Sequence, residues 1–183
     1  MSTKKKPETQ SNVKTPSSER ATLTEAVKGF PVRPDERPQT IGPAPNRQTS
    51  QFPEDPQWEE LLFDYVKTFE GVEIGHSHIS RDGGSRAFFL PQYSQLHGLQ
   101  TQFLVDNEFA HIHEHPSSSL HAVLPSEIGQ LVFEKKWGEQ HPLAILGRIS
   151  STNHLLYGAR NKQEAEQLKT LLRISYLFAS NQW

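Results

Sequence analysis

The stretch Glu108–Pro125, EFAHIHEHPSSSLHAVLP, decides the fold that we predict for this chain. Apolar and polar side chains alternate on both sides of its Pro-Ser-Ser segment, and such alternation predicts two β-strands joined by a turn. Four of the nine histidines of the chain lie within eleven residues of this stretch. These histidines are His111, His113, His115 and His121.

The apolar residues of the two strands predict how the hairpin pairs. Alternate side chains of a strand share a face, so Ala110 and Ile112 form one apolar face. Leu120, Ala122 and Leu124 form the corresponding face of the second strand. Matching these two faces sets the register and places all the histidines together on the opposite face.

The histidine face is expected to form one wall of a pocket. The register places His121 near or opposite His113, with Ser119 on the same face. Phe109 and Val123 lie at the far end of this face, so we expect it to be partly covered. A sheet face that combines clustered imidazoles with apolar side chains is typical of a ligand pocket.

The segments around the hairpin predict an α+β fold. Apolar residues from Trp58 to Phe69 recur at helical spacing, and Gly71 can end that helix. A second helix begins at Pro125-Ser126, and a capping box formed by Asn161 and Glu164 begins the last one. We therefore predict a mostly antiparallel sheet of five to six strands, packed against three helices, with an extended N-terminal arm. The further strands are expected at residues 72–80, 85–90, 101–105 and 153–159.

Composition divides the chain into three parts. Nine of the 13 prolines lie in residues 1–56, among many polar residues. Such a segment buries too little apolar surface to offset its ordering entropy, so residues 1–30 are expected to be a disordered tail. Residues 31–56 are expected to form a proline-rich arm that packs on the domain. Residues 57–183 are expected to form the α+β domain.

The bulk composition excludes several classes of function. The formal net charge of −2 does not favour nucleic-acid binding. The absence of cysteine excludes disulfides, thiolate metal sites and thiol nucleophiles. No apolar run reaches the roughly 20 residues of a membrane span, and we expect a cytoplasmic protein. The sequence has no phosphate-binding or dinucleotide-binding glycine motif and no nucleophile elbow.

The histidine pattern by itself leaves three interpretations open. Alternating polar residues are ordinary on a solvated sheet face. Two imidazoles alternating on one strand are also typical of metal ligands, and His111, His113 and His121 would then hold the ion. Glu114 points to the other face, however, so no carboxylate ligand is evident. The third interpretation is acid–base or ligand-binding chemistry, because histidine titrates near neutral pH.

The C-terminal half resembles a known family. Its motifs are EFAHIH, SLHAVLP, EKKWGEQHPLA (residues 134–144) and LLYGARNKQEAE (residues 155–166). These motifs resemble the luciferase domain of bioluminescent fungi, which belongs to a broader family in bacteria and fungi. The resemblance extends to RAFFLP (residues 86–91) and to RPQTIGPAPNRQ (residues 37–48). It therefore covers roughly residues 37–180.

The resemblance implies an oxygenase chemistry. Fungal luciferase oxygenates a hydroxylated α-pyrone, 3-hydroxyhispidin, with O2 as co-substrate and without an organic cofactor. The resemblance implies catalytic roles for His111, His113, His121 and His141, whereas His115 does not match the family pattern. The substrate is expected to be an enolisable aromatic or α-pyrone-type molecule, and a divalent metal is a less favoured possibility.

Further residues are expected to contact this substrate. Arg47 matches the family and would place a guanidinium over the pocket if the arm folds back. Trp137 and Tyr157 also match, with core packing as their alternative role, and Phe109 and Ser119 follow from the predicted histidine face. The polar N-terminus and the segment ILGRISSTNH depart from the fungal enzymes, which puts substrate identity in doubt. A non-catalytic module for small ligands or interactions is the alternative function.

Overall fold

The computed structural model describes residues 16–81, 83–93 and 100–183. Its central feature is a six-stranded antiparallel sheet with the strand order β3-β4-β5-β6-β8-β7. The arm adds a separate two-stranded sheet formed by β1 (Thr40–Ile41) and β2 (Arg47–Gln48). The predicted α+β class and antiparallel sheet are confirmed. In sheet order, the strands are β3 (Glu73–His76), β4 (Arg86–Phe89), β5 (Glu108–Ile112), β6 (Leu120–Val123), β8 (Asn153–Leu156) and β7 (Gly138–Gln140).

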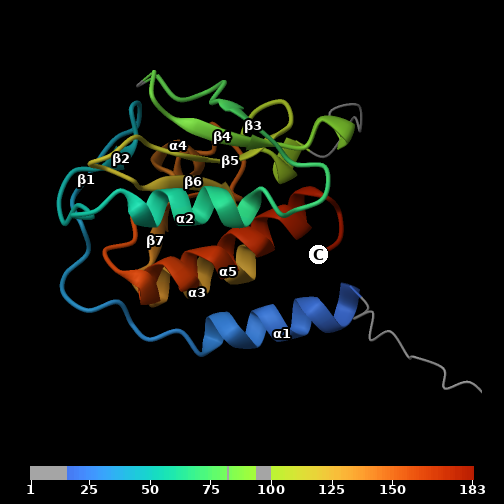
Figure 1. Cartoon of the computed structure of the whole chain (residues 1–183), viewed down its shortest axis with the longest axis horizontal. Helices are drawn as coiled ribbons and strands as arrows, with labels where there is room; N and C mark the ends of the chain where they lie inside the picture. The colour runs from blue at the N-terminus through green and yellow to red at the C-terminus, as the bar shows by residue number, and fades with distance from the viewer. Residues whose placement is uncertain (1–15, 82, 94–99) are drawn as a thin grey trace, which may run out of the picture.

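The longer helices lie together on one side of the sheet (Figure 1). The 18-residue helix α5 contacts β5, β6, α1 and α2, and therefore forms the centre of the apolar core. Its N-cap is Asn161, whose side chain accepts a hydrogen bond from the Glu164 amide at 2.9 Å, which is the N-cap half of the predicted capping box. The Glu164 carboxylate instead accepts from the Arg160 amide at 2.9 Å. The helices are α1 (Pro16–Lys28), α2 (Gln57–Val66), α3 (Ser126–Glu134), α4 (Pro142–Ile145) and α5 (Lys162–Ala179).

The central hairpin has the predicted apolar register. Ala110 pairs with Ala122 and Ile112 pairs with Leu120, and all four side chains are buried in the core. The pair between them is His111 with its partner His121 on β6. His121 therefore lies opposite His111, two residues before His113 in the chain. Its ring centroid is 5.3 Å from that of His113, so the expectation that it lies near His113 is confirmed.

A β-bulge corrects the prediction for Phe109. Phe88 of β4 pairs with Ala110, but the next residue, Phe89, pairs with Glu108, so Phe109 has no partner in the ladder. The extra residue breaks the strict alternation of side chains along the strand. Phe109 consequently lies in the core, where its ring contacts Phe88 and the Tyr176 ring of α5.

The structure differs from the predicted disordered tail at residues 16–28, which form α1. Val27 of α1 and Phe30, two residues after the helix ends, are buried in the core. This burial offsets the conformational entropy lost when the segment is ordered. The ion pair between Glu19 and Arg173 connects α1 to α5. In the sequence, the many prolines and polar residues of this segment hide the two apolar residues, Val27 and Phe30, that bind it to the core. The first fifteen residues of the predicted tail lie outside the described residues.

The arm packs on the domain through buried polar contacts. Arg33 is almost fully buried, and its guanidinium donates to the Gly158 carbonyl at 2.9 Å and to the Glu164 carboxylate at 3.1 Å. The Trp137 indole N–H donates to the Pro31 carbonyl at 2.9 Å. Further along the arm, the Gln48 side chain accepts a hydrogen bond from the Gly158 amide. These contacts hold residues 31–56 across the sheet.

Some elements differ from the sequence prediction. The expected strand at residues 101–105 is a short 3₁₀ helix, Gln100–Gln102, followed by an isolated bridge between Val105 and Glu108. Strand β7 and the four-residue helix α4 are additional, because both are too short for a periodic pattern. None of the helices in the described part of the chain is long and apolar enough to cross a membrane.

Candidate functional site

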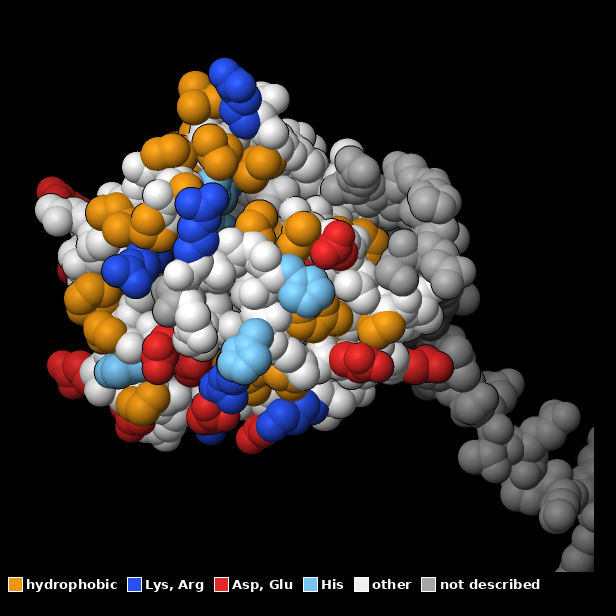
Figure 2. All heavy atoms as spheres, turned by 90° about the horizontal axis from the view of Figure 1, so that it is seen from above, with side chains coloured by type: hydrophobic (Ala, Val, Ile, Leu, Met, Phe, Trp, Pro, Cys, Tyr) orange, Lys and Arg blue, Asp and Glu red, His pale blue; other side chains and the backbone are white. Residues whose placement is uncertain are grey.

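The histidines line a cavity of about 200 Å³ on the sheet face opposite the main core. Figure 2 looks onto this side of the molecule and shows histidine surface at the bottom of a hollow framed by hydrophobic side chains. The walls come from segments far apart in the sequence: the arm, the loop after β3, the hairpin and the segment around α4. The lining residues are Pro43–Asn46, Ile79–Arg81, Leu104, His111, His113, His121, His141, Leu143, Ile149 and Asn153.

Three imidazoles form the floor of the cavity. The ring centroids of His111, His113 and His121 are separated by 5.1 Å, 5.0 Å and 5.3 Å, so the three rings are nearly equidistant. Each residue is at most 5% exposed. One ring nitrogen of each lies within 4.8 Å of a ring nitrogen of the other two. The predicted convergence of these three residues is therefore present in the structure.

The Asn46 carbonyl orients two of the three rings. It accepts hydrogen bonds from His113 Nε2 at 3.0 Å and from His121 Nε2 at 2.8 Å. A carbonyl oxygen can only accept, so both Nε2 atoms carry a hydrogen. In the neutral rings the lone pair therefore lies on Nδ1. His113 Nδ1 is 3.2 Å from the Ser85 hydroxyl, whereas His121 Nδ1 is buried without a hydrogen-bond partner.

The Glu108 carboxylate orients the third ring. Glu108 is fully buried, and its Oε1 accepts a hydrogen bond from His111 Nδ1 at 2.7 Å. The Ser77 hydroxyl and the His78 amide donate to the same carboxylate at 2.9 Å and 2.7 Å. Because Nδ1 carries the hydrogen, the lone pair of a neutral His111 lies on Nε2. That atom is buried and has no hydrogen-bond partner.

Glu108 and Asn46 are site residues that sequence reasoning missed. Strict alternation along β5 places residue 108 on the face opposite His111, and the bulge at Phe109 reverses this placement. Asn46 contributes through its backbone carbonyl, which no side-chain pattern reveals. The EFAHIH motif contains a glutamate three residues before the first histidine, and that proximity was the available signal for Glu108.

Burial lowers the pKa of two of the cavity histidines. Desolvation lowers the pKa of His121 well below 6.5, and the neighbouring His111 and His113 lower it further. The pKa of His141 is also lowered, first by burial and then by His111. The imidazoles of His121 and His141 are therefore uncharged at neutral pH, and each has one N–H donor and one acceptor nitrogen.

His141 contributes an N–H group where His111 and His121 contribute lone pairs. It is the N-cap of α4, and its Nδ1 accepts a hydrogen bond from the Leu143 amide at 3.0 Å. The hydrogen of the neutral ring must therefore be on Nε2. Its ring centroid lies 5.1 Å from that of His121. His141 thus offers a hydrogen-bond donor beside the acceptors of the other rings.

The structure does not bring the other expected substrate contacts to the cavity. Arg47 is half-buried in β2, and its neighbour Asn46 reaches the site instead. Ser119 is fully buried and accepts a hydrogen bond from the Gln48 amide. Trp137 lies in the core, and Tyr157 donates to Glu139 at 3.0 Å. Burial and the Glu139 charge raise the pKa of Tyr157 to about 12. Phe109 is in the core because of the bulge.

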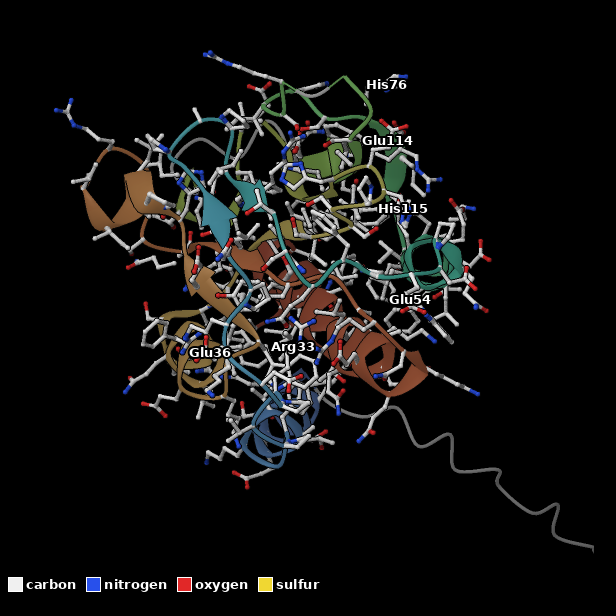
Figure 3. The ribbon with its side chains drawn as sticks, turned by 90° about the vertical axis from the view of Figure 1, so that its left-hand side faces the viewer. Arg33, Glu36, Glu54, His76, Glu114 and His115 are labelled. Carbon is white, nitrogen blue, oxygen red and sulfur yellow. The ribbon has the colours of Figure 1, made fainter. Side chains whose placement is uncertain are left out.

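The remaining histidines of the strand pattern lie outside the site. His76 and His78 are exposed, and so is His115 beyond the end of β5. Figure 3 shows Glu114 and His115 at the outer edge of the molecule, beside the labelled His76. The dispensability of His115 stays a prediction. Exposed imidazoles of this kind supply matched controls for the buried cluster.

Comparisons with known proteins identify the family that the site resembles. Residues 106–175 match the Luciferase domain family. This luciferase-domain segment contains all four cavity histidines. A luciferase of Neonothopanus nambi is 33% identical over 76 residues, which cover 40% of this chain and 28% of the relative. A luciferase of Armillaria gallica is 26% identical over 165 residues, which cover 83% of this chain. The inferred resemblance is confirmed by these matches.

The similarity has a defined extent. The chain spans 62% of the length of the Armillaria gallica luciferase, and the same share of the Armillaria ostoyae luciferase, to which it is 25% identical. No solved structure matches the chain. The luciferase-domain segment includes β5, β6 and His141, the N-cap of α4. The Asn46 carbonyl and β4 lie outside it.

Proposed function

We propose that the chain is a luciferase-like oxygenase that acts on a small enolisable aromatic or α-pyrone-type molecule with O2. The observation that supports this proposal is the pair of unpartnered imidazole lone pairs, His111 Nε2 and His121 Nδ1, on the floor of a cavity. A buried acceptor without a partner costs free energy, about 1–3 kcal/mol for each group. A ligand hydroxyl that donates to these nitrogens removes that cost.

His111 is the proton acceptor in this proposal. When an enol hydroxyl binds at Nε2, the imidazole takes the proton, and the resulting imidazolium is stabilised by Glu108 at 2.7 Å. His121 has no carboxylate behind it, because its other nitrogen donates to the Asn46 carbonyl. The carboxylate therefore distinguishes His111 as the base among the three rings.

The enolate supplies the electrons for the reaction with O2. A carbon–oxygen bond forms between the nucleophilic enolate carbon and O2. The carbon is oxidised, O2 is reduced to a peroxide, and the proton held by His111 returns to the peroxide oxygen. His141 Nε2–H is the donor that stabilises negative charge on oxygen during this step. The chemistry requires no organic cofactor.

The apolar side chains of the cavity walls keep water away from the reacting groups. Pro43, Leu104, Leu143 and Ile149 line the cavity above the imidazoles. Apolar walls exclude water, and this protects a peroxide from hydrolysis and strengthens the hydrogen bonds to the anion. Arg81 is the cationic residue of the lining and lies at an exposed position, where it favours entry of an anionic substrate.

The test is O2 uptake by the purified chain with 3-hydroxyhispidin, with light recorded at the same time. We expect saturable uptake that falls by about 10²–10⁴-fold in His111→Gln, the range for loss of a general base. His76→Gln, which changes an exposed histidine on β3, should retain full activity. Ligand binding without O2 uptake would contradict the oxygenase and favour the non-catalytic ligand-binding module.

A further inference from the structure

We propose that a groove between α3, β7 and α4 binds a small uncharged aromatic molecule that carries a hydroxyl group. The groove has a volume of about 660 Å³, which is in the range of small-molecule sites. Among the described residues, it shares no lining residue with the histidine cavity, so the proposal goes beyond the oxygenase and does not depend on it. The lining residues that carry the argument are Gly129, Gln130, Phe133, Gln140, Ile145 and His154.

His154 lies on the opposite face of the sheet from the histidine cavity. On β8, His154 pairs with Ala122 and Gln140, whereas the next residue, Leu155, pairs with His121. Because successive residues of a strand point to opposite faces, and paired residues share a face, His154 lies on the helix side with Ala122. A ligand at His154 is therefore distinct from one in the cavity at His121.

The first observation is an acceptor nitrogen of His154 that has no donor. Its Nδ1 donates to the Thr152 carbonyl at 2.8 Å, and burial lowers its pKa, so the neutral ring has its lone pair on Nε2. The residue is 5% exposed, no described residue donates to Nε2, and this atom is not sealed inside the protein as His111 Nε2 is. Because His154 lines the groove, a ligand hydroxyl there can supply the missing donor.

Gly129 of α3 leaves the space that the edge of the imidazole occupies. A Cβ at this position would lie 2.3 Å from His154 Nε2, far inside van der Waals contact. Glycine within a helix costs about 1 kcal/mol relative to alanine. The missing side chain at Gly129 therefore keeps Nε2 at the wall of the groove, where a methyl group would displace it.

The second observation is the apolar wall of the groove. Phe133 is 54% exposed and Ile145 is 68% exposed, although both side chains are large and apolar. The Arg37 guanidinium lies over the Phe133 ring, 4.2 Å from its centroid, and also donates to the Phe133 carbonyl, so the ring is held in place. An aromatic ligand in the groove packs against Phe133 and Ile145 and removes apolar surface of both from water.

The polar lining favours an uncharged hydrogen-bond donor. No lysine or arginine of the described chain lines the groove. Its one acidic residue, Glu139, already accepts hydrogen bonds from Thr40 at 2.8 Å and from Tyr157 at 3.0 Å. The side chains of Gln130 and Gln140 each donate an amide N–H to a protein acceptor, and their carbonyl oxygens have no donor among the described residues. A hydroxyl therefore finds acceptors in the groove, whereas an ion finds no free counter-charge.

The experiment measures binding of 2-naphthol, a bicyclic phenol, to the full chain by calorimetry. We expect one saturable site in the groove. His154→Phe keeps a ring but removes the acceptor, and should weaken binding about fivefold, the effect of one hydrogen bond. Phe133→Ala should also weaken binding, whereas the control Phe52→Ala, which changes another exposed phenylalanine, should not. 2-Methoxynaphthalene, which has no hydroxyl hydrogen, should bind about fivefold more weakly than 2-naphthol.

Three outcomes would overturn the proposal. The first is the absence of saturable binding, and the second is equal affinity of the parent chain and of folded His154→Phe. The third is weaker binding in His111→Gln but not in His154→Phe, which would place 2-naphthol in the histidine cavity. Amide chemical shifts of the parent chain give a test that needs no variant. They should change at Gly129 and Gln130 and not at His111, and the reverse pattern would overturn the groove as the site.

Discussion

The two faces of the central hairpin differ in how completely they are filled. Toward the helices, Ala110, Ile112 and Leu120 pack into a closed apolar core. Toward the arm, His111 and His121 occupy the intervening positions of the same strands, but they line a cavity and carry buried nitrogens without partners. One face therefore supplies stability, and the other retains unsatisfied polar groups at a cost in free energy.

The largest effect is expected on the helix side. Ile112→Ala removes a fully buried side chain between the sheet and the helices, and should lower the free energy of unfolding by about 2–5 kcal/mol. Urea denaturation measures this loss. O2 uptake per folded molecule should change little. A selective loss of uptake in fully folded protein would show that the two faces are not independent.

The next effect belongs to the cavity side. Glu108→Gln keeps a hydrogen-bond acceptor for His111 but removes the negative charge that stabilises its imidazolium. We expect kcat to fall by about 10–100-fold, with a smaller change in the urea midpoint than Ile112→Ala gives. Glu114→Gln, an exposed change on the neighbouring loop, is the matched control. Equal activity of both variants would remove Glu108 from the site.

A third prediction concerns the arm that covers the cavity side. Arg33→Met removes the buried guanidinium that binds the Gly158 carbonyl and Glu164. Arg160 still pairs with Glu164 at 2.6 Å, so the loss should be about 2 kcal/mol, below that of a buried charge left without any partner. Limited proteolysis should cleave residues 31–56 faster in the variant. Unchanged cleavage would show that other contacts hold the arm.

The smallest effect is a dependence of stability on pH. Burial lowers the pKa of His121, His141 and His154 in the folded chain below the unfolded value of 6.5. Below that pH the unfolded chain binds protons that the folded chain does not, so stability is full above about 6.5 and falls as the pH falls. Urea midpoints at pH 7.5, 6.5 and 5.5 test this. His154→Gln should reduce the fall, and an unchanged fall would exclude His154 as a contributor.

The site shows how far strand alternation alone can predict a cavity. The periodicity of β5 and β6 correctly grouped His111, His113 and His121, because the pairing of apolar faces leaves one register. The same rule failed for Phe109 and for Glu108 at one bulge. Arg47 and Ser119 lie in the correct segments, but outside the cavity lining. Alternation thus grouped the histidines where the ladder is regular, failed at the bulge, and did not show which neighbouring polar side chains reach the cavity.

The sequence by itself determined the α+β class, the antiparallel hairpin and the helices around Leu62 and Leu168, because apolar periodicity is a local property that burial enforces. Tertiary structure alone decided the chemistry of the cavity floor. The Asn46 carbonyl acts on His113 and His121 across a sequence separation of 67 and 75 residues, and the bulge turns Glu108 toward His111. Contacts between distant segments, and a backbone carbonyl in particular, leave no periodic pattern in a single sequence.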